Sequence, residues 1–426
     1  MDLKGKKVLV IGKKSSGISV SGLLKREGAI VTCVDERTKN VAADDVSLFD
    51  LIVPSPGVPP ENVFLKEAFR LNKTVLGELE IGCGFLDCPK IMVTGTNGKT
   101  TVVTMIEKLL TAAGLRARAM GNIGYPVSQV VLDGTKLDYA VIEVSSFQLE
   151  YISELHPDIA VVLNLAPDHL DRYDSYESYV ATKRKILSNV TSEDYFVYNA
   201  DDGAAKNFSK GCPAVPVPVS TIKKLSDVYV KDNFFMLGDS SLCHVKSYKL
   251  RGEHNKFNLL AALTVGNLCG VRREHMLRLI KEYALLPNRI EYVLTLGGIS
   301  FYNDSKGTNV HACMRALESM DGRVGLILGG SSKKEDFCEF FENIDKKVTL
   351  VAVTGGNADL IYNAAMKMGF TEIRILPSLA GAVNYLYRSG EVDTILLSPA
   401  CASFDRYKSY VERGEKFKEA VYALQK

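Results

Sequence analysis

Short apolar runs alternate along the chain with longer stretches whose apolar residues recur at helical spacing. A strand that is apolar at consecutive positions is buried on both faces, as in a parallel sheet covered by helices. The pattern predicts helices over 17–26, 100–110 and 176–187. It predicts strands over 7–12, 30–35, 51–53, 74–76, 91–93, 139–143, 159–165, 324–328, 350–353, 373–376 and 394–397. We therefore expect an α/β protein built on mainly parallel, doubly wound sheets.

The chain has 426 residues, more than one hydrophobic core accommodates, so two or three domains are expected. The glycine-containing segment 82–89 is the first predicted boundary, and a third domain is predicted to begin near Val293. Between them, the proline-rich segment 212–218 and the segments 228–237 and 242–245 indicate a small antiparallel excursion.

The most specific local signal is a loop between the predicted strand 91–93 and the helix over 100–110. It consists of Gly95, Thr96, Asn97, Gly98, Lys99, Thr100 and Thr101. Such a loop at a helix N-terminus directs several backbone N–H groups at one point, where the helix dipole adds positive potential. Lys99 would reach the outer phosphates of a nucleotide, and the Thr100 hydroxyl would ligate its Mg²⁺. The motif is not a full Walker A sequence, because Val93 stands in the place of the first glycine.

Candidate metal ligands follow two further strands. Glu143 ends one of them, and a carboxylate beside a phosphate loop can hold Mg²⁺. His169 follows the next strand among carboxylates, including Asp168 and Asp171, which favours a metal or substrate role.

The N-terminal β-α-β pattern indicates a phosphate-bearing ligand but lacks the dinucleotide fingerprint. In the loop 12–17, Lys14 occupies the position of the second glycine, so a nicotinamide cofactor is not expected. Ser15, Ser16 and the adjoining helix N–H groups still face a possible phosphate, and Asp35 ends the second strand.

Several segments are ambiguous from pattern alone. The proline-rich loop 54–60 is either a turn or part of a ligand crevice at the carboxyl ends of parallel strands. Asn255 and Asn258 open an Ala/Leu-rich helix, where their amides would either pair with adenine or cap the helix. Lys183 lies one helical turn from Tyr179, and its spacing does not distinguish it from a surface lysine.

Composition excludes several classes of protein. Apolar residues make up 46% of the chain and charged residues 24%, and the net charge of +2 indicates neither a nucleic-acid partner nor a membrane partner. We find no apolar run of about 18 residues and no signal-peptide pattern, and therefore expect a cytoplasmic protein. Nine cysteines without a C-x-x-C pair predict reduced thiols rather than a disulfide framework or a zinc site.

Taken in order, six motifs resemble the Mur ligases, the ATP-dependent amino-acid-adding enzymes of peptidoglycan synthesis. They are 95–101, 143–148, 168–172, 254–258, 303–309 and 398–403. The resemblance runs through the whole chain and is strongest to the members that add D-glutamate to UDP-N-acetylmuramoyl-L-alanine. It implies three α/β domains, each built on a mainly parallel sheet, and we expect a monomer. These are a Rossmann-like UDP-substrate domain over 1–88, a central P-loop ATPase domain over 89–290 and a Rossmann-like amino-acid and ATP-contacting domain over 291–426.

The resemblance also implies roles for individual residues. The residues implied to bind the UDP substrate are Ser15, Ser16, Asp35, Glu36, Arg37, Ser55, Pro56, Gly57 and Asn122. The residues implied to bind ATP are 95–101 together with Asn255, Asn258, Arg289 and Asp304. The residues implied to bind D-glutamate are Lys306, Thr308, Lys333, Ser403, Phe404 and Tyr410. The implied catalytic residues are Lys99, Glu143, His169 and Lys183, and the last three together with Thr100 would hold two Mg²⁺ ions.

The resemblance implies one covalent modification, the carbamylation of Lys183 by CO₂, which would turn a cation into an anionic metal ligand. Two positions depart from the family pattern: Lys14 replaces a glycine, and Asn288 replaces a histidine beside Arg289. Three alternatives remain open: another amino-acid ligase of the superfamily, including the folate-polyglutamating enzymes, a nucleotide-binding switch, and a redox enzyme.

Overall fold

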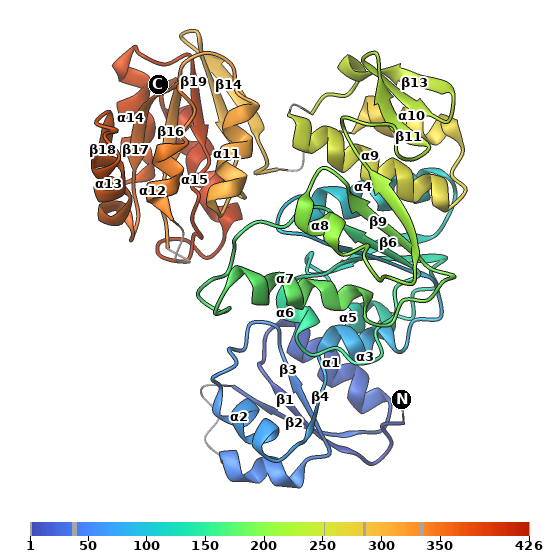
Figure 1. The fold of residues 1–426 in the computed structure, drawn as a ribbon. Coiled ribbons are helices and arrows are strands. Elements are labelled where there is room, and N and C mark those ends of the chain that lie inside the picture. The colour runs from blue at the N-terminus through green and yellow to red at the C-terminus, as the bar shows by residue number, and fades with distance from the viewer. Residues whose placement is uncertain (1, 36–40, 251, 284–286, 332–335, 426) are drawn as a thin grey trace. The chain divides into compact units, whose positions relative to one another are not determined.

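The computed structural model describes residues 2–35, 41–250, 252–283, 287–331 and 336–425 (Figure 1). Three predicted site residues, Glu36, Arg37 and Lys333, lie outside these ranges. The described residues form two compact units. The first unit comprises those of Met1–Leu165, Glu177–Tyr248 and Phe257–Tyr283, and the second those of Ala166–Tyr176, Lys249–Lys256 and Ala284–Lys426.

A parallel four-stranded sheet opens the first unit, in the order β2-β1-β3-β4. Its strands are β1 (Lys7–Ile11), β2 (Ile30–Val34), β3 (Leu51–Pro54) and β4 (Thr74–Val75), and its helices are α1 (Ser15–Arg26), α2 (Val63–Arg70) and α3 (Glu78–Cys83). Side chains alternate along β1: Val8 and Val10 belong to the core under α1, whereas Leu9 and Ile11 belong to the core under α2. The predicted β-α-β opening is confirmed.

A parallel six-stranded sheet follows in the same unit, in the order β10-β9-β8-β5-β7-β6. Its strands are β5 (Lys90–Thr94), β6 (Ala117–Gly121), β7 (Tyr139–Glu143), β8 (Ile159–Val162), β9 (Tyr195–Asn199) and β10 (Val215–Val219). The helices in this part of the chain are α4 (Lys99–Ala112), α5 (Val127–Leu132), α6 (Ser146–Leu149), α7 (Tyr176–Arg184), α8 (Gly203–Asn207), α9 (Glu253–Leu268) and α10 (Arg273–Glu282). Because β5 lies between β7 and β8, the carboxyl ends of these strands meet at one edge of the sheet.

The structure corrects the prediction for the proline-rich segment 212–218. Residues 215–219 form β10, which pairs parallel to β9 instead of joining an antiparallel excursion. Pro216 and Pro218 cannot donate to a sheet, but β10 is an edge strand with one neighbour, where proline is tolerated. The antiparallel excursion is the three-stranded sheet of β11 (Val228–Lys231), β12 (Phe234–Leu237) and β13 (Ser240–His244), as predicted.

The second unit contains a six-stranded sheet in the order β14-β15-β19-β16-β17-β18, in which only β14 is antiparallel to its neighbour. Its strands are β14 (Glu291–Leu296), β15 (Ile299–Asn303), β16 (Val324–Leu328), β17 (Val348–Val353), β18 (Ile373–Ile375) and β19 (Thr394–Leu397). Its helices are α11 (Val310–Glu318), α12 (Phe337–Glu342), α13 (Ala358–Lys367), α14 (Leu379–Ser389) and α15 (Tyr410–Ala423). Leu326 and Leu328 share a core with α11, α12 and α13, and Ile327 shares one with α14 and α15 (Figure 1). The doubly wound arrangement is therefore confirmed.

All nine cysteines lie in the described part of the chain and are free thiols. Among the helices that the structure describes, none combines the length and the apolar composition that a bilayer-spanning segment needs.

Candidate active site

The predicted phosphate loop connects β5 to α4 in the first unit. Gly98 occupies the N-cap position of α4 in the left-handed region, with φ of +87°, where a side chain is disfavoured. A Cβ atom there would also lie 2.5 Å from Asn258 Oδ1, so Asn258 borders the loop. The Lys99 ammonium group donates to the carbonyl oxygens of Gly95 and Thr96, at 2.8 and 2.9 Å. The loop therefore has the compact shape and the cation that phosphate binding requires.

Asn164, which the sequence analysis did not select, holds the tip of this loop. Its Nδ2 donates to the Asn97 carbonyl oxygen, and its Oδ1 accepts from the Asn97 N–H, both at 2.9 Å. Its own carbonyl oxygen accepts from the Thr96 N–H at 2.8 Å. Asn164 interrupts the apolar run 159–166, but nothing in the local sequence identifies residues 96 and 97 as its partners.

Glu143, at the end of β7, joins two other predicted residues. The Thr100 hydroxyl donates to Glu143 Oε2 at 2.7 Å, and Asn122 Nδ2 donates to Glu143 Oε1 at 2.8 Å. Glu143 is buried, with 3% of its surface exposed, so these hydrogen bonds fix its carboxylate next to the phosphate loop.

The chemistry of these groups fits Mg²⁺. Carboxylate and hydroxyl oxygens are its preferred ligands, and it commonly completes its shell with water and nucleotide phosphates. Within the described ranges, no cluster of three His, Cys, Asp or Glu side chains could hold a metal ion by itself. Thr100 and Glu143 would thus hold the ion together with a bound nucleotide.

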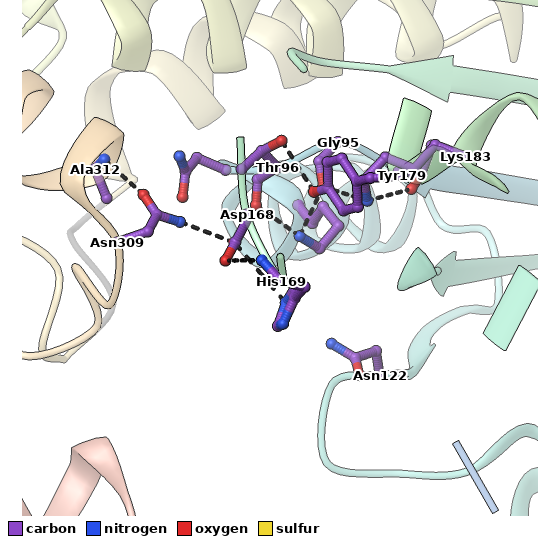
Figure 2. Close-up of polar contacts among 12 residues, drawn as sticks. Gly95, Thr96, Asn122, Asp168, His169, Tyr179, Lys183, Asn309 and Ala312 are labelled. Carbon is purple, nitrogen blue, oxygen red and sulfur yellow. Dashed lines mark hydrogen bonds and ion pairs between the residues drawn. The ribbon is translucent and has the colours of Figure 1, made fainter. Parts of the chain in front are cut away.

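Lys183 is deeply buried on α7, with 1% of its surface exposed. Its Nζ lies 3.0 Å from the Gly95 carbonyl oxygen and 4.9 Å from the centre of the Tyr179 ring (Figure 2). The Tyr179 hydroxyl in turn lies 3.0 Å from Thr96 Oγ1. Lys183 therefore lies against the phosphate loop and not on the surface, a distinction that its spacing from Tyr179 left open.

His169 belongs to the second unit, unlike Glu143 and Lys183, so its place in one metal site with them stays a prediction. Its backbone is left-handed, with φ of +56°, which is unusual for a residue with a side chain. Its Nε2 lies 3.8 Å from Asp168 Oδ2. Its neighbour Asp168 accepts from the His169 N–H at 2.9 Å and from Asn309 Nδ2 at 3.0 Å (Figure 2).

At the N-terminal sheet, the structure brings the loops after β1 and β3 together. A Cβ on Gly12 would lie 2.6 Å from Ser55 Oγ, and a Cβ on Gly17 would lie 1.9 Å from the Gly12 carbonyl oxygen. Among the described residues, buried Ser55 Oγ has no hydrogen-bond partner, so it remains available to a ligand.

The other predicted residues at this sheet follow β1, β2 and β3. Ser15 and Ser16 begin α1, Pro56 and Gly57 follow Ser55, and Asp35 forms an ion pair of 3.6 Å with Lys13. Lys14, which departs from the glycine of the family pattern, is exposed at the N-cap of α1.

In the second unit, Asp304 is buried after β15. Ser398 Oγ donates to its Oδ2 at 2.7 Å, and the Ile290 N–H donates to its Oδ1 at 3.3 Å. Burial raises the pKa of Asp304 to about 7, and the Ser398 hydrogen bond opposes this rise. A neutral carboxyl is therefore favoured in the folded protein below this pH.

Asp304→Asn is expected to gain stability relative to the unmodified protein as the pH rises from 5 to 8. The Asp304 carboxyl has a higher pKa in the folded protein than in the unfolded chain, so it contributes its full stability to the folded state only below the unfolded-state pKa. This contribution is lost as the pH rises through the folded-state pKa of about 7. Asparagine does not ionise, so the difference in the free energy of unfolding shifts in its favour by at most about 3 kcal/mol. Thermal unfolding at both pH values measures the shift, and an equal difference at pH 5 and pH 8 would contradict it.

Other predicted amino-acid-binding residues gather after β15 and β19. Lys306 Nζ lies 3.9 Å from the centre of the Tyr410 ring, and Ser305 Oγ donates to the Tyr410 carbonyl oxygen at 2.8 Å. Ser403 is buried, whereas Phe404 is 76% exposed.

Buried Arg413 connects these loops and was missed by the sequence analysis. It donates to the Ser305 carbonyl oxygen at 2.9 Å, to Ser305 Oγ at 3.0 Å and to the Cys401 carbonyl oxygen at 3.0 Å. Burial lowers its pKa to about 10. An arginine on an amphipathic helix gives no signal of this role, since most arginines are exposed.

The remaining predicted nucleotide residues lie in the second unit. Asn288 precedes Arg289 with φ of +65°, and its Oδ1 accepts from Asn303 Nδ2 at 2.9 Å. Asn288, which departs from the histidine of the family pattern, thus occupies a left-handed position of a kind in which asparagine is enriched. Asn255 is buried at the start of α9.

Comparisons with known proteins agree with this architecture. The Mur ligase middle domain matches residues 93–266, and the Mur ligase glutamate ligase domain matches residues 288–401. Two solved structures share the fold over 99% of the chain. A pseudomurein peptide ligase type C from Methanothermus fervidus has a TM-score of 0.63 at 17% identity, with all of that chain covered. The MurF ligase from Thermotoga maritima in complex with ADP has 0.63 at 18% identity, with 96% of that chain covered.

The chain belongs to the Mur ligase family. Its curated relatives include proteins named UDP-N-acetylmuramoylalanine--D-glutamate ligase. The one from Caldanaerobacter subterraneus subsp. tengcongensis is 35% identical over the full length of both chains. The one from Ligilactobacillus salivarius is 36% identical over 99% of this chain and 97% of the relative.

Proposed function

We propose that this protein joins D-glutamate to the carboxylate of UDP-N-acetylmuramoyl-L-alanine, with conversion of ATP to ADP and phosphate, in peptidoglycan precursor synthesis. The observation that carries the chemistry is the phosphate loop itself, where the Lys99 ammonium group donates to the Gly95 carbonyl oxygen and the Thr100 hydroxyl donates to Glu143. Full-length similarity to relatives named for this reaction supports the choice of substrates. The domains proposed are residues 1–88, 89–290 and 291–426.

The first step activates the acid. A carboxylate is a poor electrophile at neutral pH, so one of its oxygens attacks the γ-phosphorus of ATP, ADP leaves, and an acyl phosphate forms. Lys99 and the loop N–H groups stabilise the charge of the transferring phosphoryl group. Thr100 and Glu143 would hold Mg²⁺, whose charge would offset that of the phosphates.

The second step forms the amide bond. The amine of D-glutamate attacks the acyl carbon, phosphate leaves with the former carboxylate oxygen, and the amine loses a proton. Lys306, Thr308, Lys333, Ser403, Phe404 and Tyr410 are proposed to hold the amino acid. Their contribution is positional, because an oriented nucleophile reacts far faster than a free one.

Further assignments belong to the same proposal. Asn255, Asn258, Arg289 and Asp304 contact the nucleotide, and Ser15, Ser16, Asp35, Glu36, Arg37, Ser55, Pro56, Gly57 and Asn122 contact the UDP substrate. His169 and a carbamate on Lys183 would support a second Mg²⁺. The protein acts as a monomer in the cytoplasm, with no nucleic-acid or membrane partner.

A panel of L- and D-amino acids tests the substrate assignment. Enzyme, ATP, Mg²⁺ and UDP-N-acetylmuramoyl-L-alanine are incubated with each amino acid, and products are identified by mass spectrometry. We expect one amide product, from D-glutamate, with stoichiometric phosphate release. Extension of a folate acceptor in place of the UDP substrate would assign the protein to another ligase of the superfamily.

A further inference from the structure

One asparagine in the second unit uses both ends of its amide group. Asn309 Oδ1 accepts from the Ala312 N–H at 2.8 Å and thereby caps the N-terminus of α11. Its Nδ2 donates to Asp168 Oδ2 at 3.0 Å (Figure 2). Asn309 is 4% exposed and the Asp168 side chain 8%, so water competes little with this bond.

The second oxygen of Asp168 holds the turn that carries His169. Asp168 Oδ1 accepts from the His169 N–H at 2.9 Å. The His169 carbonyl oxygen accepts from the N–H groups of Arg172 and Tyr173, at 2.9 and 3.1 Å. Since His169 is left-handed, with φ of +56°, its conformation depends on such surrounding bonds.

Asn309 also ends the loop that carries Lys306 and Thr308. The Lys306 N–H donates to the Asn288 carbonyl oxygen at 3.0 Å, which fixes the start of this loop. The Asn309 cap fixes its end on α11. Two hydrogen bonds thus connect the end of this loop, through the Asp168 carboxylate, to the His169 N–H.

We propose that Asn309 is a positioning residue that couples the amino-acid-binding loop to the His169 turn. This inference rests on the proposed function, because it assigns a purpose to Lys306, Thr308 and His169. Helix capping requires only an acceptor at position 309, whereas the link to Asp168 requires a donor. Substitutions can separate the two roles.

Asn309→Ser keeps a capping oxygen but removes the donor that reaches Asp168. Asn309→Asp keeps the cap and places a second carboxylate against Asp168. Hydrogen bonds to charged groups contribute about 1.5–3 kcal/mol, so kcat/KM for D-glutamate is expected to fall about 10- to 100-fold in both variants. KM for ATP should stay within about twofold of its value in the unmodified protein. Unchanged kcat/KM for D-glutamate in both variants would overturn the proposal.

Exchanging the two side chains provides a rescue. In the double variant Asn309→Asp and Asp168→Asn, the residue at 309 accepts at both oxygens, while the residue at 168 donates to it and still accepts from the His169 N–H. The coupling predicts at least about tenfold more activity in the double variant than in Asn309→Asp. Additive losses from the two single changes would contradict it.

Ser378→Ala is the matched control for loss of a helix cap. Ser378 Oγ accepts from the Gly381 N–H at the start of α14, and we place it outside the substrate sites. It should lower the melting temperature without changing kcat/KM for D-glutamate.

Hydrogen exchange separates this inference from the proposed function. If D-glutamate is not the substrate, the function proposal fails, yet the Arg172 and Tyr173 amides should still exchange at least about tenfold faster in Asn309→Ser than in the unmodified protein. Equal exchange in the two proteins would exclude the coupling whatever the substrate.

Discussion

Lys99→Ala is expected to lower kcat by about 10³ or more. The Lys99 ammonium group is held against the carbonyl oxygens of Gly95 and Thr96, at the N-terminus of α4 where phosphates would bind. There it stabilises charge that develops on the transferring phosphoryl group, and removal of such a group costs orders of magnitude in rate. Steady-state phosphate release measures the effect.

Lys108→Ala is the control, because Lys108 lies on the same helix but is exposed and contacts the Tyr283 ring at 4.8 Å. Its kcat should stay within about threefold of the unmodified enzyme. Unchanged turnover in Lys99→Ala would remove Lys99 from the phosphoryl-transfer step.

Lys183→Ala is expected to lose activity by about 10³ or more and to recover partly when short carboxylates such as formate or acetate are added. The proposed carbamate forms when the neutral amine attacks CO₂ and releases a proton, leaving an anion beside Gly95 and Thr94. A small acid diffusing into the space left by alanine would replace that anion. Activity is measured against carboxylate concentration.

Lys185→Ala is the control variant for Lys183→Ala, because Lys185 lies two residues further along the chain. Lys185 is exposed and donates to the Glu150 carbonyl oxygen at 3.2 Å, so its loss should change activity little. Full activity of Lys183→Ala without an additive would disprove the carbamate role.

Much of the architecture could be predicted because the relevant signals are local. The consecutive apolar positions of β5, β7, β16 and β19 predicted buried parallel strands. The sequence around Gly98 and Lys99 predicted a tight loop at the N-terminus of a helix, which is found at the start of α4. The position of Glu143 beside the phosphate loop was also expected, since neighbouring parallel strands end at one edge of a sheet, and the structure adds its hydrogen bond with Thr100.

What could not be predicted depends on distant partners. The apolar and proline residues of β10 suit an edge strand of either direction, and pairing with β9 decides it. Asn164 and Arg413 owe their roles to loops that lie 67 and 108 residues away in sequence, so no local pattern marks them. Burial of Lys183 likewise follows from the packing of α7 against the phosphate loop.

The most direct test of the account labels the acceptor carboxylate of UDP-N-acetylmuramoyl-L-alanine with ¹⁸O and follows the label during one round of amide formation with D-glutamate and ATP. If the acid attacks the γ-phosphorus, each amide bond formed should release one phosphate that carries one ¹⁸O atom, together with ADP. Amide formation with unlabelled phosphate, or with the label in AMP, would contradict phosphoryl activation at this site.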